Sequence, residues 1–414
     1  MDLVHERAAG IDISKRDAKV AIRVPGKRAG AFTTSVTTWA ATSNQILALR
    51  QMLIDERVTT VVMEATSDYW KPFFYLFEDV LPVMLVNAKA AKNIPGRKTD
   101  VSDASWLAQL GAHGLLRACF VPAEPIRELR DLTRARTIAA QDRTRETQRL
   151  EKFLESTGIK LSASVSDLMG ASSRAMLDAL ITGERDPDRL AEPAKGAMRN
   201  RIPELVEALT GRFTEHHAFI CRMHLDRIDS ITEWVEQLTN RIEEAMEPFR
   251  VARDYLITIP GVSVKVADVI VAETGADMSR FESPGRLASW AGVCPGSNES
   301  AGRVKSTRTR PGNQYLKGAL GLAALSIARH PSGTYLGVRH KRIIARRGKL
   351  KAVVATEHSI LTAVWHMLAN GVIYDDPGAD FFAARGNPDR EKTNALNRLR
   401  SLGYQVTLTP VEAA

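Results

Sequence analysis

The chain is 414 residues long, which is enough for two or three domains with sizeable hydrophobic cores. It contains 57 Lys and Arg against 48 Asp and Glu, a net charge of +9, and 44% of its residues are hydrophobic. This composition excludes a disordered chain and favours a polyanionic partner.

The cysteines and the hydropathy pattern indicate the cellular compartment. Cys119, Cys221 and Cys294 are odd in number and far apart, which disfavours a disulfide framework and a zinc site of paired cysteines. The longest apolar run, residues 318–328, is too short to span a bilayer, and the first residues lack the apolar segment of an export signal. We therefore expect a cytoplasmic protein with no membrane contact.

The first 125 residues predict an α/β domain. Residues 8–24 have the pattern of a β-hairpin, and residues 30–38 could supply a third strand. A helix is predicted at 44–56, a buried strand at 59–64, another strand at 83–86 and a last helix from 100 onward. Three strands followed by alternating helix and strand are typical of a mixed sheet of the ribonuclease H kind. We take residues 1–125 as this domain.

The remainder of the chain is predicted to be mainly helical. Apolar residues alternate in steps of three and four, the pattern of a coiled coil or helical hairpin, at Ile228, Ile231, Val235, Leu238, Ile242, Ala245 and Phe249. Residues 126–154 are the candidate partner helix. We expect a helical coiled-coil region at 126–250, a second compact domain at 251–375 and a peripheral tail at 376–414.

Four acids on three separate elements of the first domain form a candidate metal site. Asp12 interrupts an apolar strand, Glu64 ends another, and Asp100 and Asp103 stand three apart at a helix start. Singly, each has an ordinary explanation as a turn residue, a strand-end ion pair or a favourable charge at a helix N-terminus. Together they predict an all-oxygen site for Mg²⁺ or Mn²⁺, and two such ions about 4 Å apart would serve phosphoryl transfer.

The second domain carries features that favour phosphate binding. Residues 255–262 read as an apolar helix end followed by a Pro-Gly turn at Gly261, which indicates either a phosphate-binding helix-hairpin-helix or a plain tight turn. A Gly/Ser-rich loop then leads into a stretch, 300–356, without any Asp or Glu. Such a one-sided charge pattern favours a nucleic-acid surface. The candidate contacts are Lys98, Gly261, Arg303, Lys305, Arg308, Arg310, Arg346 and Arg347.

The motifs around these residues resemble a known family. Residues 10–15, 63–66 and 98–104, which hold the four acids, are similar to the Asp-Glu-Asp-Asp domain of the Piv-like transposases, insertion-sequence family 110. Residues 291–295, 298–302 and 312–313 follow in the order and spacing of that family's transposase domain. The resemblance implies a RuvC-like nuclease fold and, in the second domain, a serine nucleophile at Ser300, with Ser297 as its competitor.

The same resemblance implies the reaction and the partners. A nucleoid-associated bacterial recombinase would hold Mg²⁺ at Asp12, Glu64, Asp100 and Asp103, form a transient serine–DNA bond, and join donor and target DNA under the guidance of a structured RNA. A coiled-coil arm would make it a dimer or tetramer.

Three alternatives remain open from the sequence. A RuvC-like junction-resolving nuclease would use metal-activated water instead of Ser300. An actin-like sugar kinase shares the sheet, but no second Asp-Gly phosphate loop is found. A non-catalytic nucleic-acid-binding protein would leave the four acids without a purpose.

Overall fold

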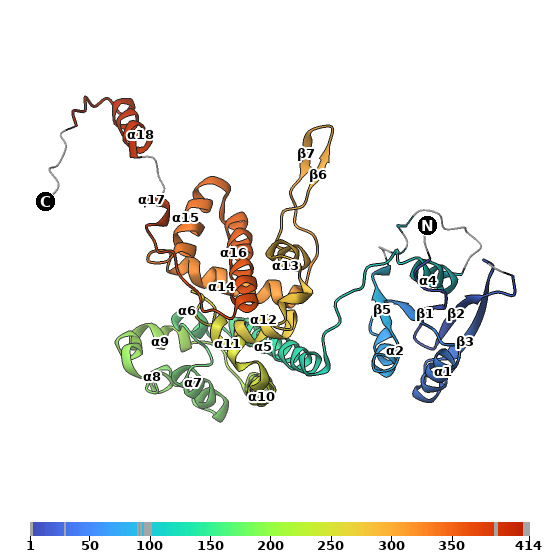
Figure 1. Ribbon diagram of the computed structural model, residues 1–414. Helices are drawn as coiled ribbons and strands as arrows, with labels where there is room; N and C mark the ends of the chain where they lie inside the picture. The colour runs from blue at the N-terminus through green and yellow to red at the C-terminus, as the bar shows by residue number, and fades with distance from the viewer. Residues whose placement is uncertain are drawn as a thin grey trace. The chain divides into compact units, whose positions relative to one another are not determined.

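The computed structural model describes residues 3–28, 30–88, 91, 93, 94, 102–384 and 388–408. The chain divides into two compact units, Met1–Pro122 and Ala123–Ala414, and each is considered by itself (Figure 1). Within the described part of the chain, no helix is both long and apolar enough to cross a membrane. The finer division of the second unit stays a prediction.

The first unit is built on a five-stranded sheet with the order β3-β2-β1-β4-β5. β1 pairs antiparallel with β2, β2 antiparallel with β3, and β1, β4 and β5 run parallel. The predicted mixed sheet is therefore confirmed, and it is consistent with a RuvC-like domain. The strands are β1 (Ala8–Ile13), β2 (Asp17–Pro25), β3 (Phe32–Ala40), β4 (Thr60–Glu64) and β5 (Val83–Val86).

Helices cover both faces of this sheet. α1 (Ser43–Asp55) and α2 (Trp70–Phe77) share a core with Ile11 and Val61 on one face. α4 (Asp103–Ala112) packs on the other face with Val62. Because side chains alternate along a strand, Gly10 and Asp12 lie on the α4 side.

Gly10 lets α4 come unusually close to β1. A Cβ at Gly10 would stand 2.1 Å from the carbonyl oxygen of Ala104 and 2.4 Å from the amide nitrogen of Ala108. Since no side chain fits there, the first turns of α4 lie directly on the strand that carries Asp12. Gly10 thus lets the beginning of α4 pack against the strand that carries Asp12.

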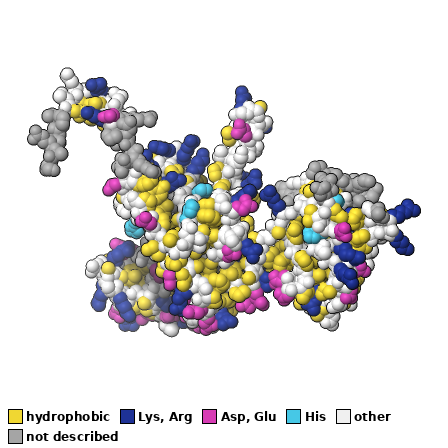
Figure 2. Space-filling model, in the orientation of Figure 1, with side chains coloured by type: hydrophobic (Ala, Val, Ile, Leu, Met, Phe, Trp, Pro, Cys, Tyr) yellow, Lys and Arg dark blue, Asp and Glu magenta, His cyan; other side chains and the backbone are white. Residues whose placement is uncertain are grey.

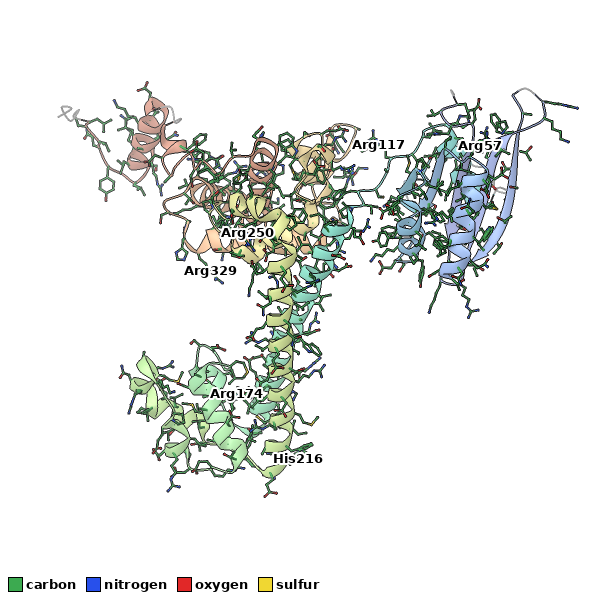
Figure 3. The ribbon with its side chains drawn as sticks, turned by 60° about the horizontal axis from the view of Figure 1, so that its bottom comes forward. Arg57, Arg117, Arg174, His216, Arg250 and Arg329 are labelled. Atoms are coloured by element: carbon green, nitrogen blue, oxygen red, sulfur yellow. The ribbon has the colours of Figure 1, made fainter. Side chains whose placement is uncertain are left out.

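The second unit contains an arm of two long helices, α5 (Glu124–Thr157) and α10 (Glu215–Ala245). They run side by side in opposite directions (Figure 3). Ile228, Ile231 and Ile242 of the predicted apolar repeat are buried on α10. The repeat therefore marks a helical hairpin, as the sequence predicts.

A small helical cluster, with its own apolar core, lies at one end of the arm (Figure 3). Leu150 and Leu154 of α5 and Cys221 and Leu225 of α10 join this core. Its helices are α6 (Leu161–Ser164), α7 (Ala171–Thr182), α8 (Pro187–Ala191), the 3-10 helix η1 (Gly196–Arg201) and α9 (Ile202–Leu209). The arm and this cluster together occupy the middle third of the sequence.

At the other end of the arm lies a helical body (Figure 3), which carries a β-hairpin (Figure 1). The hairpin of β6 (Asn298–Ser300) and β7 (Arg303–Ser306) projects from it. The remaining elements are η2 (Glu247–Phe249), α11 (Arg250–Leu256), α12 (Val264–Thr274), η3 (Met278–Arg280), α13 (Pro284–Trp290), α14 (Gln314–Arg329), α15 (Tyr335–Arg347), α16 (Lys349–Asn370), α17 (Phe381–Ala384) and α18 (Pro388–Ser401).

Candidate functional site

Asp12 and Glu64 lie on neighbouring parallel strands, on the same face of the sheet. Ile11 is paired with Met63, so the next residues, Asp12 and Glu64, are level with each other at the carboxyl ends of β1 and β4. Adjacent strands are about 4.8 Å apart, which brings the two Cα atoms close. Glu64 is buried and Asp12 is half-buried. The first two members of the predicted tetrad are therefore brought together.

The other two acids precede or begin α4. Asp103 is the first residue of α4, half-buried, one residue after Ser102, whose hydroxyl accepts the Ser105 N–H and caps the helix. Asp100 and the predicted phosphate contact Lys98 lie outside the described residues. Among the side chains that the structure describes, no three acids, histidines or cysteines come close enough to share a metal ion.

The donor set nevertheless fits a hard cation in part. Both converging groups are carboxylates, the ligands that Mg²⁺ and Mn²⁺ prefer. Asp103 is the residue before Ala104, whose carbonyl oxygen lies against Gly10 of β1. A two-carboxylate site with a third acid on the adjoining helix is thus what the described residues offer.

Ser300 lies at the end of β6, exposed, next to a tight turn. Ala301 and Gly302, with φ angles of 51° and 74°, form the turn, and Ser300 is paired with Arg303. Positive φ at both turn residues is the geometry of two-residue hairpins. The prediction of a loop here was wrong, because the segment forms the strands β6 and β7. Short strands of exposed polar residues lack the alternation of apolar and polar residues by which strands are found in a sequence.

The pairing has a chemical consequence. Residues paired across a hairpin project from the same face, with Cβ atoms about 5 Å apart, so Arg303 stands beside Ser300. Glu299 projects from the opposite face. Ser297 is also exposed but precedes the strand. The hairpin therefore presents a serine hydroxyl next to a guanidinium group.

Glycines hold the two legs of this hairpin together at its base. A Cβ at Gly312 would stand 2.3 Å from the carbonyl oxygen of Ala291, and one at Gly296 would stand 2.3 Å from that of Arg308. Lys317 of α14 adds hydrogen bonds to the Gly292 carbonyl and the Thr309 hydroxyl, both 3.4 Å long. These motif glycines are thus packing positions, where the backbone must pass without a side chain.

The predicted basic contacts form two exposed groups. One is on the hairpin and its following leg, and the other is at the end of α15, and Figure 2 shows Lys and Arg side chains gathered at both places. No ion pair among the described residues involves any of them. The members are Arg303, Lys305, Arg308, Arg310, Arg346 and Arg347.

Gly261 lies in the turn between α11 and α12, so the predicted helix, turn and helix are all present. It has a φ of 82°, and a Cβ there would stand 2.7 Å from the carbonyl oxygen of Ala323 on α14. The packing of the turn on α14 explains this glycine without a ligand. The contact of Gly261 with nucleic acid stays a prediction.

Two buried acids on α12 were missed from the sequence. Asp268 accepts a hydrogen bond of 2.9 Å from Arg136, and Glu273 pairs with Arg134 at 2.7 Å. Burial raises the pKa of Asp268 in spite of its ion pair with Arg136. The signal in the sequence is weak: the arginines that pair with these acids, Arg134 and Arg136, stand in a helix that carries many other charged residues.

Comparison with known proteins identifies the family of this chain. A transposase family model, that of the Asp-Glu-Asp-Asp domain of IS110 elements, matches residues 9–159, and the model described as the transposase IS116/IS110/IS902 family matches residues 253–336. The insertion element IS900 uncharacterized 42 kDa protein of Mycobacterium paratuberculosis is 29% identical over 308 residues, 67% of this chain and 73% of that protein.

The first match contains the acid-bearing strands and the second contains the serine hairpin. Both favour a transposase over a junction-resolving nuclease. The chain belongs to the IS110 family of insertion-sequence transposases, enzymes of DNA recombination.

Proposed function

We propose that this transposase cuts and rejoins DNA through a covalent bond to Ser300, with carboxylates of the first unit completing the site. The observation that carries the proposal is the hairpin: an exposed serine paired with Arg303, where a stretch free of acids begins. A phosphate that reaches Ser300 meets a cation and no nearby carboxylate on the same face. The cation would stabilise the charge of the transition state, and the carboxylates or their metal would have to activate the serine hydroxyl.

The step balances as a transesterification. The Ser300 hydroxyl oxygen attacks a DNA phosphorus atom, a Ser–O–P bond forms, and one P–O bond to deoxyribose breaks. The serine proton passes to solvent water, and the released deoxyribose oxygen takes up a proton from solvent water. Attack of a deoxyribose hydroxyl on the phosphoserine then restores both the DNA backbone and the free serine. Arg303 stabilises the charge that builds up on the non-bridging oxygens.

Asp12, Glu64, Asp100 and Asp103 would hold Mg²⁺ or Mn²⁺ in this scheme. A bound ion would supply positive charge to the reacting phosphate and make a carboxylate-rich site accessible to DNA. The level register of Asp12 and Glu64 supports this assignment. The chain's own part is to set these acids on a rigid sheet edge, with α4 held close by Gly10.

The partners follow from the exposed cations. Arg346 and Arg347 end α15 without acidic partners among the described residues, a surface suited to phosphate backbones rather than base edges. We propose that a structured RNA supplies sequence choice by base pairing and that the protein reads shape and backbone. DNA and RNA would share this basic surface.

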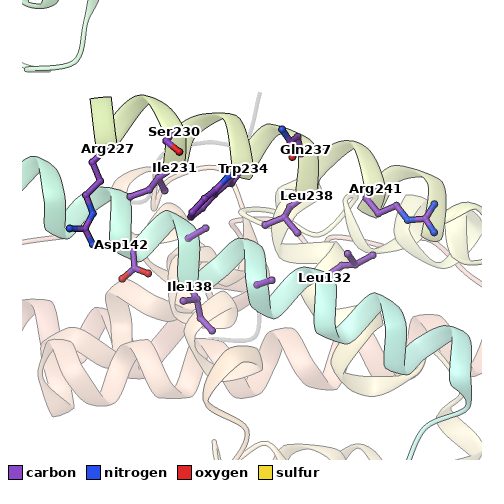
Figure 4. Close-up of a pocket in the computed structure, with 12 residues that line it drawn as sticks. Leu132, Ile138, Asp142, Arg227, Ser230, Ile231, Trp234, Gln237, Leu238 and Arg241 are labelled. Carbon is purple, nitrogen blue, oxygen red and sulfur yellow. The ribbon is translucent and has the colours of Figure 1, made fainter. Parts of the chain in front are cut away.

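A second copy of the chain is the proposed occupant of a groove on the arm. The groove, about 760 Å³, runs between α5 and α10 and is lined mostly by apolar side chains (Figure 4). Ile138 and Trp234 are 45% and 57% exposed there. Asp142 lies at one end of the groove and Arg241 at the other (Figure 4), and each is already paired within its own helix, so the apolar side chains between them are what a second copy related by a two-fold axis would cover.

The deciding experiment traps the reaction in denaturant and maps the peptide linked to DNA. Ser300→Ala should keep DNA and RNA binding but give no adduct and no recombination, because the nucleophile is gone. Ser297→Ala is the matched control and should still form the adduct. An adduct that persists in Ser300→Ala, or one that maps to Ser297, would refute the assignment.

A further inference from the structure

The base of the serine hairpin is tied to the beginning of α5 through one buried carboxylate. We propose that Glu273 is a positioning residue, which fixes the Ser300 hairpin through Asn313 and α5 through Arg134. The inference rests on the proposed role of Ser300. It assigns Glu273 no contact with DNA.

Glu273 is fully buried near the end of α12 and is held by three side chains. Arg134 donates two hydrogen bonds to its carboxylate, of 2.7 and 2.8 Å, and Arg130 lies 3.3 Å away. The side-chain amide of Asn313 donates a third bond, of 2.5 Å. A two-pronged arginine–carboxylate pair is both strong and directional, so the orientation of Glu273 is fixed.

Asn313 connects this carboxylate to the hairpin. Its side-chain oxygen accepts the N–H groups of Tyr315 and Leu316 at 3.1 Å and caps α14, while its amide nitrogen faces Glu273. Both ends of the amide are therefore used, which leaves it one orientation. The residue before it is Gly312, at the crossing of the two hairpin legs. A shift of Asn313 would therefore move the base of the hairpin.

The α5 side is anchored equally firmly. Arg130 donates to the carbonyl oxygens of Ala272 and Glu273, at 3.1 and 2.8 Å, and so binds the end of α12. The Arg134 guanidinium lies 4.8 Å from the centre of the Tyr315 ring. α5 begins at Glu124, directly after the last residues of the first unit. The chain that leaves the carboxylate-bearing unit thus continues into α5, the helix whose Arg130 and Arg134 pair with Glu273.

Geometry is what such a cluster contributes to catalysis. A buried ion pair adds little net stability, but it fixes the positions of the groups that it joins. Misplacement of a reacting group by about 1 Å costs up to about a hundredfold in rate. The cluster spans α5, α12 and the start of α14, and it lies at the hairpin base rather than at Ser300. Its loss should therefore slow the reaction of Ser300 without removing the nucleophile.

The test separates positioning from folding by changing Asn313 rather than Glu273. Asn313→Ser keeps a good helix cap but loses the amide donor, so α14 stays capped while the link to Glu273 is broken. Asn313→Asp, nearly the same in size, also keeps a helix cap but puts a second carboxylate against Glu273 in place of the amide donor. Asp186→Ala, which removes the cap of the remote helix α8, controls for a general loss of stability.

Adduct formation is measured in a single turnover at saturating DNA, together with recombination yield, DNA affinity and thermal unfolding. Asn313→Ser and Asn313→Asp should both form the adduct about 10- to 100-fold more slowly, and the DNA affinity and thermal unfolding of Asn313→Ser should stay close to those of Asp186→Ala. A wild-type rate in either variant overturns the proposal.

Failure of the proposed nucleophile has a different outcome. In that case the unsubstituted protein recombines DNA without any Ser300 adduct. The losses in Asn313→Ser and Asn313→Asp are then read from recombination yield, which still supports or refutes the role of Glu273.

Discussion

Glu357 shows how a single buried group gives the transposase body a pH dependence. It lies on α16, 4% exposed, with its Oε2 atom lacking a hydrogen-bond partner. Burial raises the pKa of Glu357, and the nearby charge of Lys317 offsets this only in part. The folded protein therefore holds this proton more tightly than the unfolded chain does. Its contribution to stability is complete below the ordinary pKa of 4.5 and is lost as pH rises through the higher folded value.

We predict that Glu357→Gln removes this pH dependence. The free energy of unfolding of the variant, relative to that of the unsubstituted protein, should be constant below about pH 4 and rise in the variant's favour towards pH 7. Hydrogen exchange of the α14 and α16 amides measures it locally. The exposed Glu192→Gln is the control and should show no such trend. A difference that is flat with pH would contradict the assignment of this titration.

At the scale of elements, the structure shows which signals in the sequence are sufficient. The succession of strands and the apolar repeat on α10 could be predicted, because buried apolar runs mark β1 and β4 and apolar residues in steps of three and four mark one face of α10. The hairpin at 298–306 could not, because both of its strands are exposed and held by turn geometry and by glycine crossings at their base. The sequence predicted that Asp12 and Glu64 share a site, but not that they are level on neighbouring strands. Strand pairing depends on residues far apart in the chain, which the local pattern does not show.

The groove on the arm gives a prediction at this scale. Trp234→Glu should weaken self-association by about 2 kcal/mol or more, about 30-fold in Kd, because a buried aromatic anchor is replaced by a charge. Analytical ultracentrifugation measures the dissociation constant. Phe219→Glu changes another exposed aromatic of α10, 66% exposed and outside the groove, and should leave association unchanged. If Trp234→Glu and the unsubstituted protein have the same average molar mass at every protein concentration, the proposed dimer is contradicted.

For the whole molecule, the net charge of +9 is less informative than where the cations lie. The cations of the helical cluster on the arm include some that are paired, such as Arg174 with Asp229 at 2.6 Å. Those of the hairpin and of α15 have no ion-pair partner among the described residues. Overall composition favoured a polyanionic partner from the outset, but only the fold shows which cations are available to it.

We predict that replacing Arg346, Arg347 and Lys349 together by Ala weakens binding to DNA and RNA of any sequence. Each lost phosphate contact lowers the slope of log K against log salt by about 0.9, so the total change should be about 2 to 3. A fluorescence titration at several salt concentrations measures it. The equally charged control replaces the exposed Lys195, Arg199 and Arg212 of the helical cluster. If both triple variants change the slope alike, net charge rather than this surface governs binding.

The two helices of the arm have nearly the same length, 34 residues in α5 and 31 in α10. At 1.5 Å per residue they are rods of about 51 and 46 Å. The chain leaves the body along α5 and returns along α10. The helical cluster between them is therefore an insertion, and its two ends lie side by side at the tip of the arm. Adding or deleting seven residues in both helices changes the reach by about 10 Å while the seam keeps facing inward. The arm is therefore a spacer of adjustable length, and its tip can be moved outward or inward without disturbing the helices that hold the serine hairpin.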